Sequence, residues 1–145
     1  MTAVAAEQEI QVLHVAKDVQ IAAPIGVVFE TLLETEPRSG LNLKIEAWPG
    51  GRWYRDLGNN TGHLWGHVQV IKPPTLLEIC GPMFMSYPVA SHIQYRLSEE
   101  DGGTRLSLVH QAIGLISPEH QEGVQKGWAE VLQNVRAGAE AKRKK

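Results

Sequence analysis

Residues 117–142 read SPEHQEGVQKGWAEVLQNVRAGAEAK and predict one long helix near the end of the chain. The apolar side chains recur at helical spacing and form a single stripe roughly 100° wide. This stripe contains Val124, Trp128, Val131, Leu132, Val135 and Ala139. Ser117 suits the N-cap and Pro118 the first helical position. Interior glycines cost about 1 kcal/mol each, whereas burying the stripe contributes up to about 10 kcal/mol, so we expect the helix to depend on a partner surface.

That partner surface is predicted to be a β-sheet, because strand patterns fill most of the preceding sequence. Alternating or β-rich runs between turn signals predict strands over residues 11–22, 43–48, 52–57, 63–72, 75–80, 89–97 and 104–113. A short helix over residues 25–34 follows the first strand, and residues 35–42 form a connection. Short turns between successive strands produce an antiparallel meander, one face of which the final helix covers. The predicted fold class is therefore α+β.

A curved sheet fits closely against a single helix along only part of its length, so a gap is expected elsewhere. We expect Gly123 and Gly127 to widen this gap, because they place no side chain on the helix. The gap is then either a ligand cavity or a dry, tightly packed core.

Composition narrows the class of protein. The length of 145 residues predicts one domain, over residues 10–142, and the lack of periodicity in residues 1–9 predicts a flexible leader there. Cys80 is the single cysteine, and no segment resembles a secretion signal or a membrane span, so a cytoplasmic protein is expected. The 14 Lys and Arg against 16 Asp and Glu give a net charge of −2, which argues against a nucleic-acid partner.

Five short motifs occur in an order and spacing that resemble a known family. They are Pro24-x-x-x-Val28-Phe29, Pro49-Gly50-Gly51-x-Trp53, Gly66-x-Val68 followed by Pro73-Pro74-x-x-Leu77, Gly103-Thr104-x-Leu106, and Gly127-Trp128-x-x-x-Leu132. Over roughly residues 12–137 the chain resembles the START-like or SRPBCC superfamily. Within it, the chain is similar to the group of the activator of the ninety-kilodalton heat-shock-protein ATPase.

This resemblance implies a helix-grip fold, as in the birch-pollen allergen. In that fold, a curved antiparallel sheet of about six to seven strands holds the C-terminal helix around a hydrophobic cavity. Members of the group usually carry a longer, Trp-containing segment where residues 35–42 stand here. The family shares no universal catalytic residues, so the resemblance implies a fold and a cavity rather than a reaction.

Metal chemistry is weakly supported by the histidine pattern. His63-x-x-x-His67 has a spacing that suits zinc on a helix, but its neighbours predict a strand. Residues four apart on a strand lie about 13 Å from each other, too far for one ion. We therefore expect neither a metal nor a cofactor.

The predicted ligand site combines inward-facing aromatic, apolar and polar side chains. Its residues are Trp53, Trp65, Met83, Phe84, Tyr95, His110, Trp128 and Leu132. His110 and Tyr95 share strand faces with apolar residues, so each either orients a ligand or satisfies a backbone group. Alternation along residues 63–72 favours Leu64, Val68 and Val70 as the inner set; an outward Trp65 and His67 would suggest a self-association surface instead.

Three functions are compatible with these features. The leading hypothesis is binding of a small hydrophobic or amphipathic molecule between the sheet and the final helix. The second is a protein-interaction module that contacts a chaperone or another copy of the chain as a homodimer. The third is a metal-free enzyme of the cyclase or aromatase type, with His110 or Tyr95 as acid or base. It ranks last because the sequence offers no diagnostic pair of titratable groups.

Overall fold

The computed structural model describes residues 9–34 and 42–143. The predicted leader, apart from Glu9, and the predicted connection, apart from Asn42, lie outside the described residues. Within the described residues, two helices and seven strands form the α+β fold that the sequence predicts. Their bounds are β1 Gln11–Ile21, α1 Ile25–Leu32, β2 Leu43–Ile45, β3 Arg52–Gly58, β4 Thr61–Lys72, β5 Leu76–Gly81, β6 Val89–Glu100, β7 Gly103–Gly114 and α2 Pro118–Arg143.

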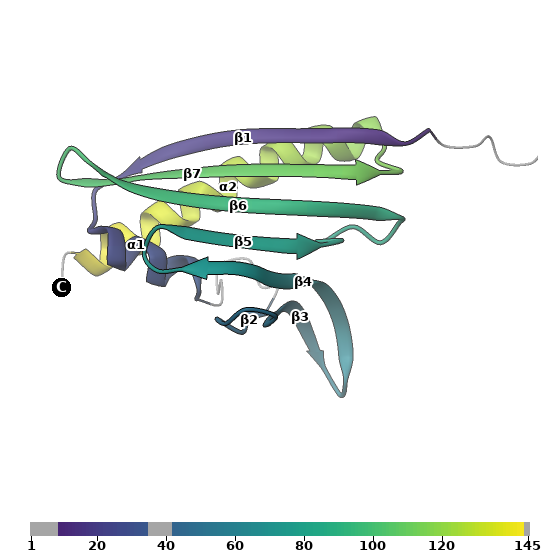
Figure 1. The fold of residues 1–145 in the computed structure, drawn as a ribbon, viewed down its shortest axis with the longest axis horizontal. Helices are drawn as coiled ribbons and strands as arrows, with labels where there is room; N and C mark the ends of the chain where they lie inside the picture. Colours follow the sequence, from purple (N-terminus) through teal and green to yellow (C-terminus); the bar gives the residue numbers. More distant parts are fainter. Residues whose placement is uncertain (1–8, 35–41, 144–145) are drawn as a thin grey trace, which may run out of the picture.

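All seven strands belong to one antiparallel sheet in the order β1-β7-β6-β5-β4-β3-β2. Strands β2 to β7 are sequential neighbours, as expected for a meander, whereas β1 pairs with β7 along its whole length. The chain therefore crosses from one edge of the sheet to the other between β1 and β2. Figure 1 shows the β3–β4 hairpin curling away from the flatter strands β1, β7 and β6.

Helix α2 crosses one face of the sheet diagonally and ends beside α1 (Figure 1). The predicted stripe faces the sheet: Val124, Trp128, Leu132, Val135 and Ala139 are buried, and Val131 packs against the same core. The N-cap prediction is also confirmed, because the Ser117 hydroxyl accepts a hydrogen bond from the His120 backbone N–H at 3.2 Å. Apolar packing and the N-cap together fix the position of the helix.

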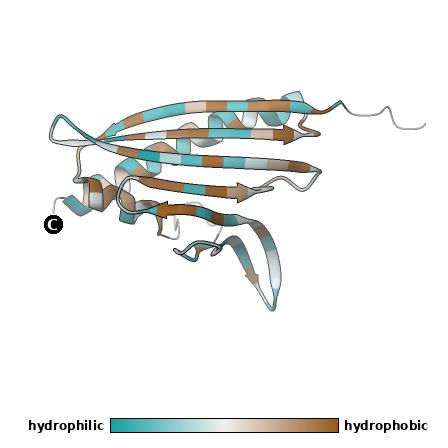
Figure 2. Cartoon of the chain, viewed as in Figure 1, coloured by the Kyte–Doolittle hydropathy of each residue, from teal (hydrophilic) through white to brown (hydrophobic). Residues whose placement is uncertain are grey.

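Alternation along the long strands separates a buried face from a solvent face. Figure 2 shows hydrophobic and hydrophilic bands following one another along β1, β6 and β7. On β6 the buried positions are Ser91, Ile93, Tyr95 and Leu97, each two residues from the next. The core lies between this face and the two helices.

Two hairpins are tighter than the sequence suggests. Asn59 and Asn60 both have positive φ, at 53° and 59°, as do Asp101 and Gly102, at 48° and 76°. Two such residues form the type I′ turn that matches the twist of antiparallel strands. The strands on either side are consequently longer than predicted, whereas β2 is shorter and ends at Ile45.

The expectation that Gly123 and Gly127 widen a gap beneath α2 is wrong. Both glycines are exposed, and a Cβ atom added at either position would meet no atom within 4 Å. Neither glycine belongs to the buried stripe of α2, so both lie on the solvent face of the helix. Neither glycine therefore affects the packing of α2 on the sheet.

We expect Gly123→Ala and Gly127→Ala each to stabilise the protein by about 0.5–1 kcal/mol, since alanine restricts the unfolded chain and meets no obstacle in the helix. Urea unfolding measures this gain. The matched control is Gly138→Ala, where the new Cβ would lie 3.3 Å from Cγ2 of Thr31 on α1 and the gain should be smaller. Loss of stability in both exposed variants would contradict this assignment of the solvent face.

Candidate functional site

Strand β4 carries a β-bulge at Trp65. Trp53 pairs with Gly66 and Tyr54 pairs with Leu64, so Trp65 has no partner on β3. A bulge adds one residue to one strand and reverses the alternation of side chains beyond it. A second irregularity follows, because Val68 pairs with Ile79 and Val70 with Glu78.

The bulge corrects the predicted orientation of β4. Trp65 is 8% exposed and lies on the inner, concave face, whereas Leu64 is 43% exposed on the outside. Val68 is buried as predicted, because it lies beyond the bulge. His63 contacts the Trp65 ring on the inner face and His67 is exposed, so the two histidines do not share a face. The suggested self-association surface at Trp65 and His67 is therefore wrong.

Glycines on β4 and β5 allow the bulge to form. A Cβ atom on Gly81 would lie 2.5 Å from the Trp65 carbonyl oxygen, and one on Gly66 would lie 2.6 Å from the Cys80 carbonyl oxygen. Real Cβ atoms do not approach backbone atoms so closely, so only glycine fits at both positions. The two backbones thus come into close contact next to Trp65.

The segment over residues 82–88 joins this bulge to helix α2. The Met83 N–H donates a hydrogen bond to the Trp65 carbonyl at 2.7 Å, and Met83 is fully buried with φ of 60°. At the other end, the Tyr87 hydroxyl lies 2.8 Å from Nδ1 of His120, with the two rings stacked. Left-handed backbone at a residue other than glycine is strained, and these contacts hold it in place.

Six aromatic rings form a continuous series across the concave face, which we call the aromatic row: Trp53, Trp65, Phe84, His110, Trp128 and Tyr95. Successive centroids lie 5.0, 5.5, 6.5, 5.6 and 6.2 Å apart. Every contact is edge-to-face, the arrangement that the ring quadrupoles favour. The row runs from Trp53 on β3 to Trp128 on helix α2 and ends at Tyr95 on β6.

His110 links the sheet to the helix through both ring nitrogens. The Trp128 indole N–H donates to Nδ1 at 2.8 Å, and Nε2 lies 3.0 Å from the Ser91 hydroxyl. Because Nδ1 accepts, the neutral ring carries its proton on Nε2 and donates it to Ser91. His110 therefore satisfies two side chains, rather than the backbone group that the sequence suggested as its alternative role.

Burial lowers the pKa of His110 to about 4. Burial also raises the pKa of the Tyr95 hydroxyl above its usual value. At neutral pH both side chains are consequently neutral, and neither is ready to exchange a proton. The geometry favours a structural or ligand-contacting role for them over acid–base catalysis.

Two buried donors on the concave face, Nε of Arg55 and Nε1 of Trp65, have no hydrogen-bond partner within residues 9–34 and 42–143. Buried indole N–H groups usually find an acceptor. Arg55 is directly opposite His63 on the neighbouring strand. These donors mark the polar end of the aromatic row.

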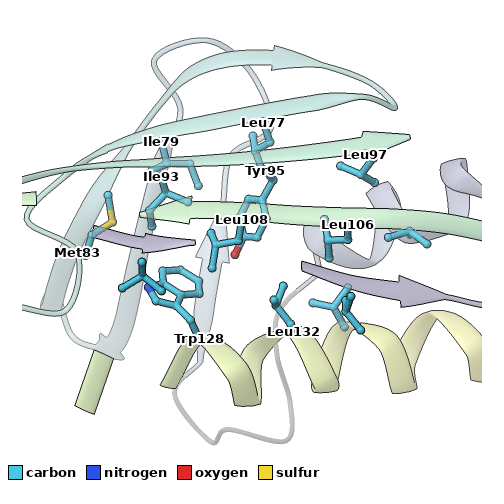
Figure 3. Close-up of a cluster of buried hydrophobic side chains, with 14 of the residues drawn as sticks. Leu77, Ile79, Met83, Ile93, Tyr95, Leu97, Leu106, Leu108, Trp128 and Leu132 are labelled. Carbon is cyan, nitrogen blue, oxygen red and sulfur yellow. The ribbon is translucent and has the colours of Figure 1, made fainter. Parts of the chain in front are cut away.

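The structure brings together all eight residues of the predicted ligand site. Six of them make up the aromatic row, and Met83 and Leu132 belong to the core beside it. Figure 3 shows Tyr95 and Leu108 pointing toward Trp128 and Leu132 of the helix. Whether a ligand contacts these residues stays a prediction.

Sequence reasoning missed Arg55, Ser91 and the contact between Tyr87 and His120. Arg55 could have been found, because it lies two residues from the inward Trp53 on the same strand. The glycine after Trp65 was a further signal, since glycine inside a strand often marks a bulge. The pairing of Tyr87 with His120 has no such local signal.

An open pocket lies elsewhere, between the start of α1 and the β6–β7 turn. Its lining consists of Pro24, Ile25 and residues 99–103. None of the predicted site residues contributes to it. In residues 9–34 and 42–143, no cluster of three or more His, Cys, Asp or Glu side chains is arranged to hold a metal ion. No helix within these same ranges is both long and apolar enough to span a membrane.

Residues 22–139 match the sequence model of a family described as activator of Hsp90 ATPase homolog 1-like protein. The chain belongs to this family. The match covers most of the chain and includes every residue of the aromatic row. A search of curated proteins found no match.

Solved structures share the fold of this Hsp90 ATPase activator homolog 1-like chain. An uncharacterized protein from Rhizobium leguminosarum has a TM-score of 0.74 at 18% identity, covering 94% of this chain and 99% of its own. A protein from Chromobacterium violaceum has a TM-score of 0.68 at 19% identity, with coverages of 88% and 96%. CalU16 from Micromonospora echinospora has a TM-score of 0.62 at 21% identity, with coverages of 91% and 87%. At these identities the likeness establishes the helix-grip fold alone.

The buried His110 should make stability sensitive to acid. Its pKa falls from 6.5 in the unfolded chain to about 4 in the folded protein, so only the unfolded chain gains a proton between these values. Stability should therefore decrease as pH falls from 6.5 to 4, with a contribution of up to about 3 kcal/mol. Urea unfolding of wild type and His110→Gln at several pH values measures it.

The difference in unfolding free energy between wild type and His110→Gln should shrink across this window, because glutamine does not titrate. His14→Gln is the control, since His14 is exposed on β1 and its removal should leave the acid loss in place. A difference between wild type and His110→Gln that stays constant from pH 7 to pH 4 would contradict the buried, neutral assignment.

Proposed function

We propose that this protein binds a small hydrophobic or amphipathic molecule on the concave face, between the curved sheet and α2. The observation that carries the proposal is the aromatic row, which extends from half-buried Trp53 to fully enclosed His110. Aromatic and thioether side chains adapt to flat or elongated apolar ligands with little loss of conformational freedom. The predicted residues Met83 and Leu132 supply the aliphatic part of the same surface.

Phe84 is the feature of this row that packing explains least. It is 40% exposed, yet its ring contacts Trp65 and His110. The adjacent Met83 is strained and buried, so the backbone holds Phe84 in a defined position at the surface. We infer that Phe84 forms the rim where a ligand enters.

The uncharged dye N-phenyl-1-naphthylamine tests this proposal, because tryptophan emission excites it when it binds nearby. We expect saturable binding with energy transfer, and displacement by members of a panel of aromatic and lipid-like molecules. Phe84→Ala should weaken dye binding about fivefold, since one aromatic contact contributes about 1 kcal/mol.

Ile113→Ala is the matched control, because Ile113 is exposed on the outer face of β7 and should leave dye affinity unchanged. Equal affinities for wild type, Phe84→Ala and Ile113→Ala would contradict the location of the site. Absence of dye binding and of displacement by any compound would contradict the proposed function itself.

A second candidate function is interaction with another protein, and an apolar patch on the outer face supports it. Val12 and Ile113 are register partners on β1 and β7 and are 69% and 54% exposed. Ile10 extends this patch along the edge of the sheet. The patch fits a homodimer or a chaperone contact, and sedimentation across a concentration series separates a self-associating chain from a monomer that only binds ligand.

A further inference from the structure

We propose that Arg55 and Trp65 form a binding site for the carboxylate group of an apolar carboxylic acid. The inference rests on the proposed function and deepens it by naming the chemical class of the ligand. Its starting point is that Nε of Arg55 and Nε1 of Trp65 are buried donors with no partner among the residues that the structure describes. A buried donor without an acceptor is destabilising, and an acceptor supplied by a ligand removes this penalty.

The pairing of β3 with β4 brings the two donors to one part of the concave face. Arg55 lies directly opposite His63, and the His63 ring packs edge-to-face against the Trp65 ring, with ring centroids 6.3 Å apart. Trp53 lies two residues before Arg55 and therefore on the same face of β3. The centroids of the Trp53 and Trp65 rings lie 5.0 Å apart. Arg55 thus lies on the same face of the β3–β4 hairpin as the three contacting rings of Trp53, Trp65 and His63.

Charge at this cluster favours an anionic ligand group. Three other arginines have carboxylate partners: Arg52 pairs with Glu46, Arg105 with Asp18 and Glu100, and Arg136 with Glu140. Arg96 and Arg143 have none among the described residues, but neither has a buried donor without a partner. Across the described ranges, no carboxylate lies within 4.0 Å of the Arg55 guanidinium.

The carboxylate nearest in sequence does not compensate Arg55. Asp56 is the next residue on β3, and side chains alternate along a strand, so it projects to the opposite face. There it binds the Lys44 ammonium at 2.8 Å. The positive charge of Arg55 consequently remains available to a ligand.

The chemistry of the donor set favours a carboxylate attached to an apolar body. A carboxylate has two coplanar acceptor oxygens and one negative charge, which one guanidinium balances, and charge-assisted hydrogen bonds are the stronger ones. The adjoining Trp53, Trp65 and Phe84 rings offer apolar contact to the rest of the molecule. A ligand with both parts would satisfy the donors and cover the row at once.

The test compares 2-naphthoate with 2-methylnaphthalene, which has the same ring system and no acceptor. Displacement of N-phenyl-1-naphthylamine gives both affinities in wild type, Arg55→Met and Trp65→Phe. We expect wild type to bind 2-naphthoate about tenfold more tightly, because charge-assisted hydrogen bonds add to the shared ring contacts. Each variant should lose most of this preference and bind 2-methylnaphthalene within about twofold of wild type.

Arg52→Met is the matched control, because Arg52 lies on the same strand, is exposed and pairs with Glu46 on the outer face. It should leave both affinities unchanged. Retained binding of 2-methylnaphthalene in Arg55→Met and Trp65→Phe shows that these variants still fold.

The carboxylate assignment is overturned if wild type binds both compounds equally, or if the variants weaken both compounds to the same extent. In those cases the proposed function survives, because apolar binding persists. Binding of neither compound by wild type overturns the proposed function together with this assignment.

Discussion

The position of α2 on the sheet depends on a buried polar contact between Trp128 and His110. Apolar packing is not directional, so the stripe of α2 alone would allow the helix to shift along the concave face. The indole N–H has one direction, and its acceptor on His110 is itself held by Ser91 of β6. Breaking the series of hydrogen bonds from Trp128 through His110 to Ser91 would leave polar groups buried without partners, at a cost of about 1–3 kcal/mol. The contact therefore fixes one arrangement of helix and sheet.

The candidate site depends on departures from regular structure rather than on the regular strands. The bulge on β4 directs Trp65 inward, and two glycines permit the close approach of β4 and β5 that accompanies it. The same region holds Met83 in a strained conformation through its hydrogen bond to the Trp65 carbonyl. Bulges and strained backbone conformations persist only when the contacts around them hold them in place, and they often occur at functional sites.

The sequence predicted the fold better than it predicted the orientation of side chains on β4. The stripe of α2, the N-cap at Ser117 and the meander follow from local periodicity, and all are present. The inward direction of Trp65 was not predictable from alternation, because the extra residue at the bulge places Leu64 and Val68, four residues apart, on opposite faces. Arg55 was missed because its candidate role rests on a buried Nε–H group without an acceptor. Such a group can be recognised only once the pairing of β3 with β4 is known.

The most direct measurement of the central claim is NMR of the indole N–H groups in 15N-labelled protein. The chain has four tryptophans, and the account predicts that saturating 2-naphthoate forms a new hydrogen bond only at Trp65. Its Nε1–H resonance should move downfield, with no such shift for 2-methylnaphthalene, while the Trp128 resonance stays near its free position because His110 already binds it. A Trp65 resonance that is unchanged by saturating 2-naphthoate would contradict the account.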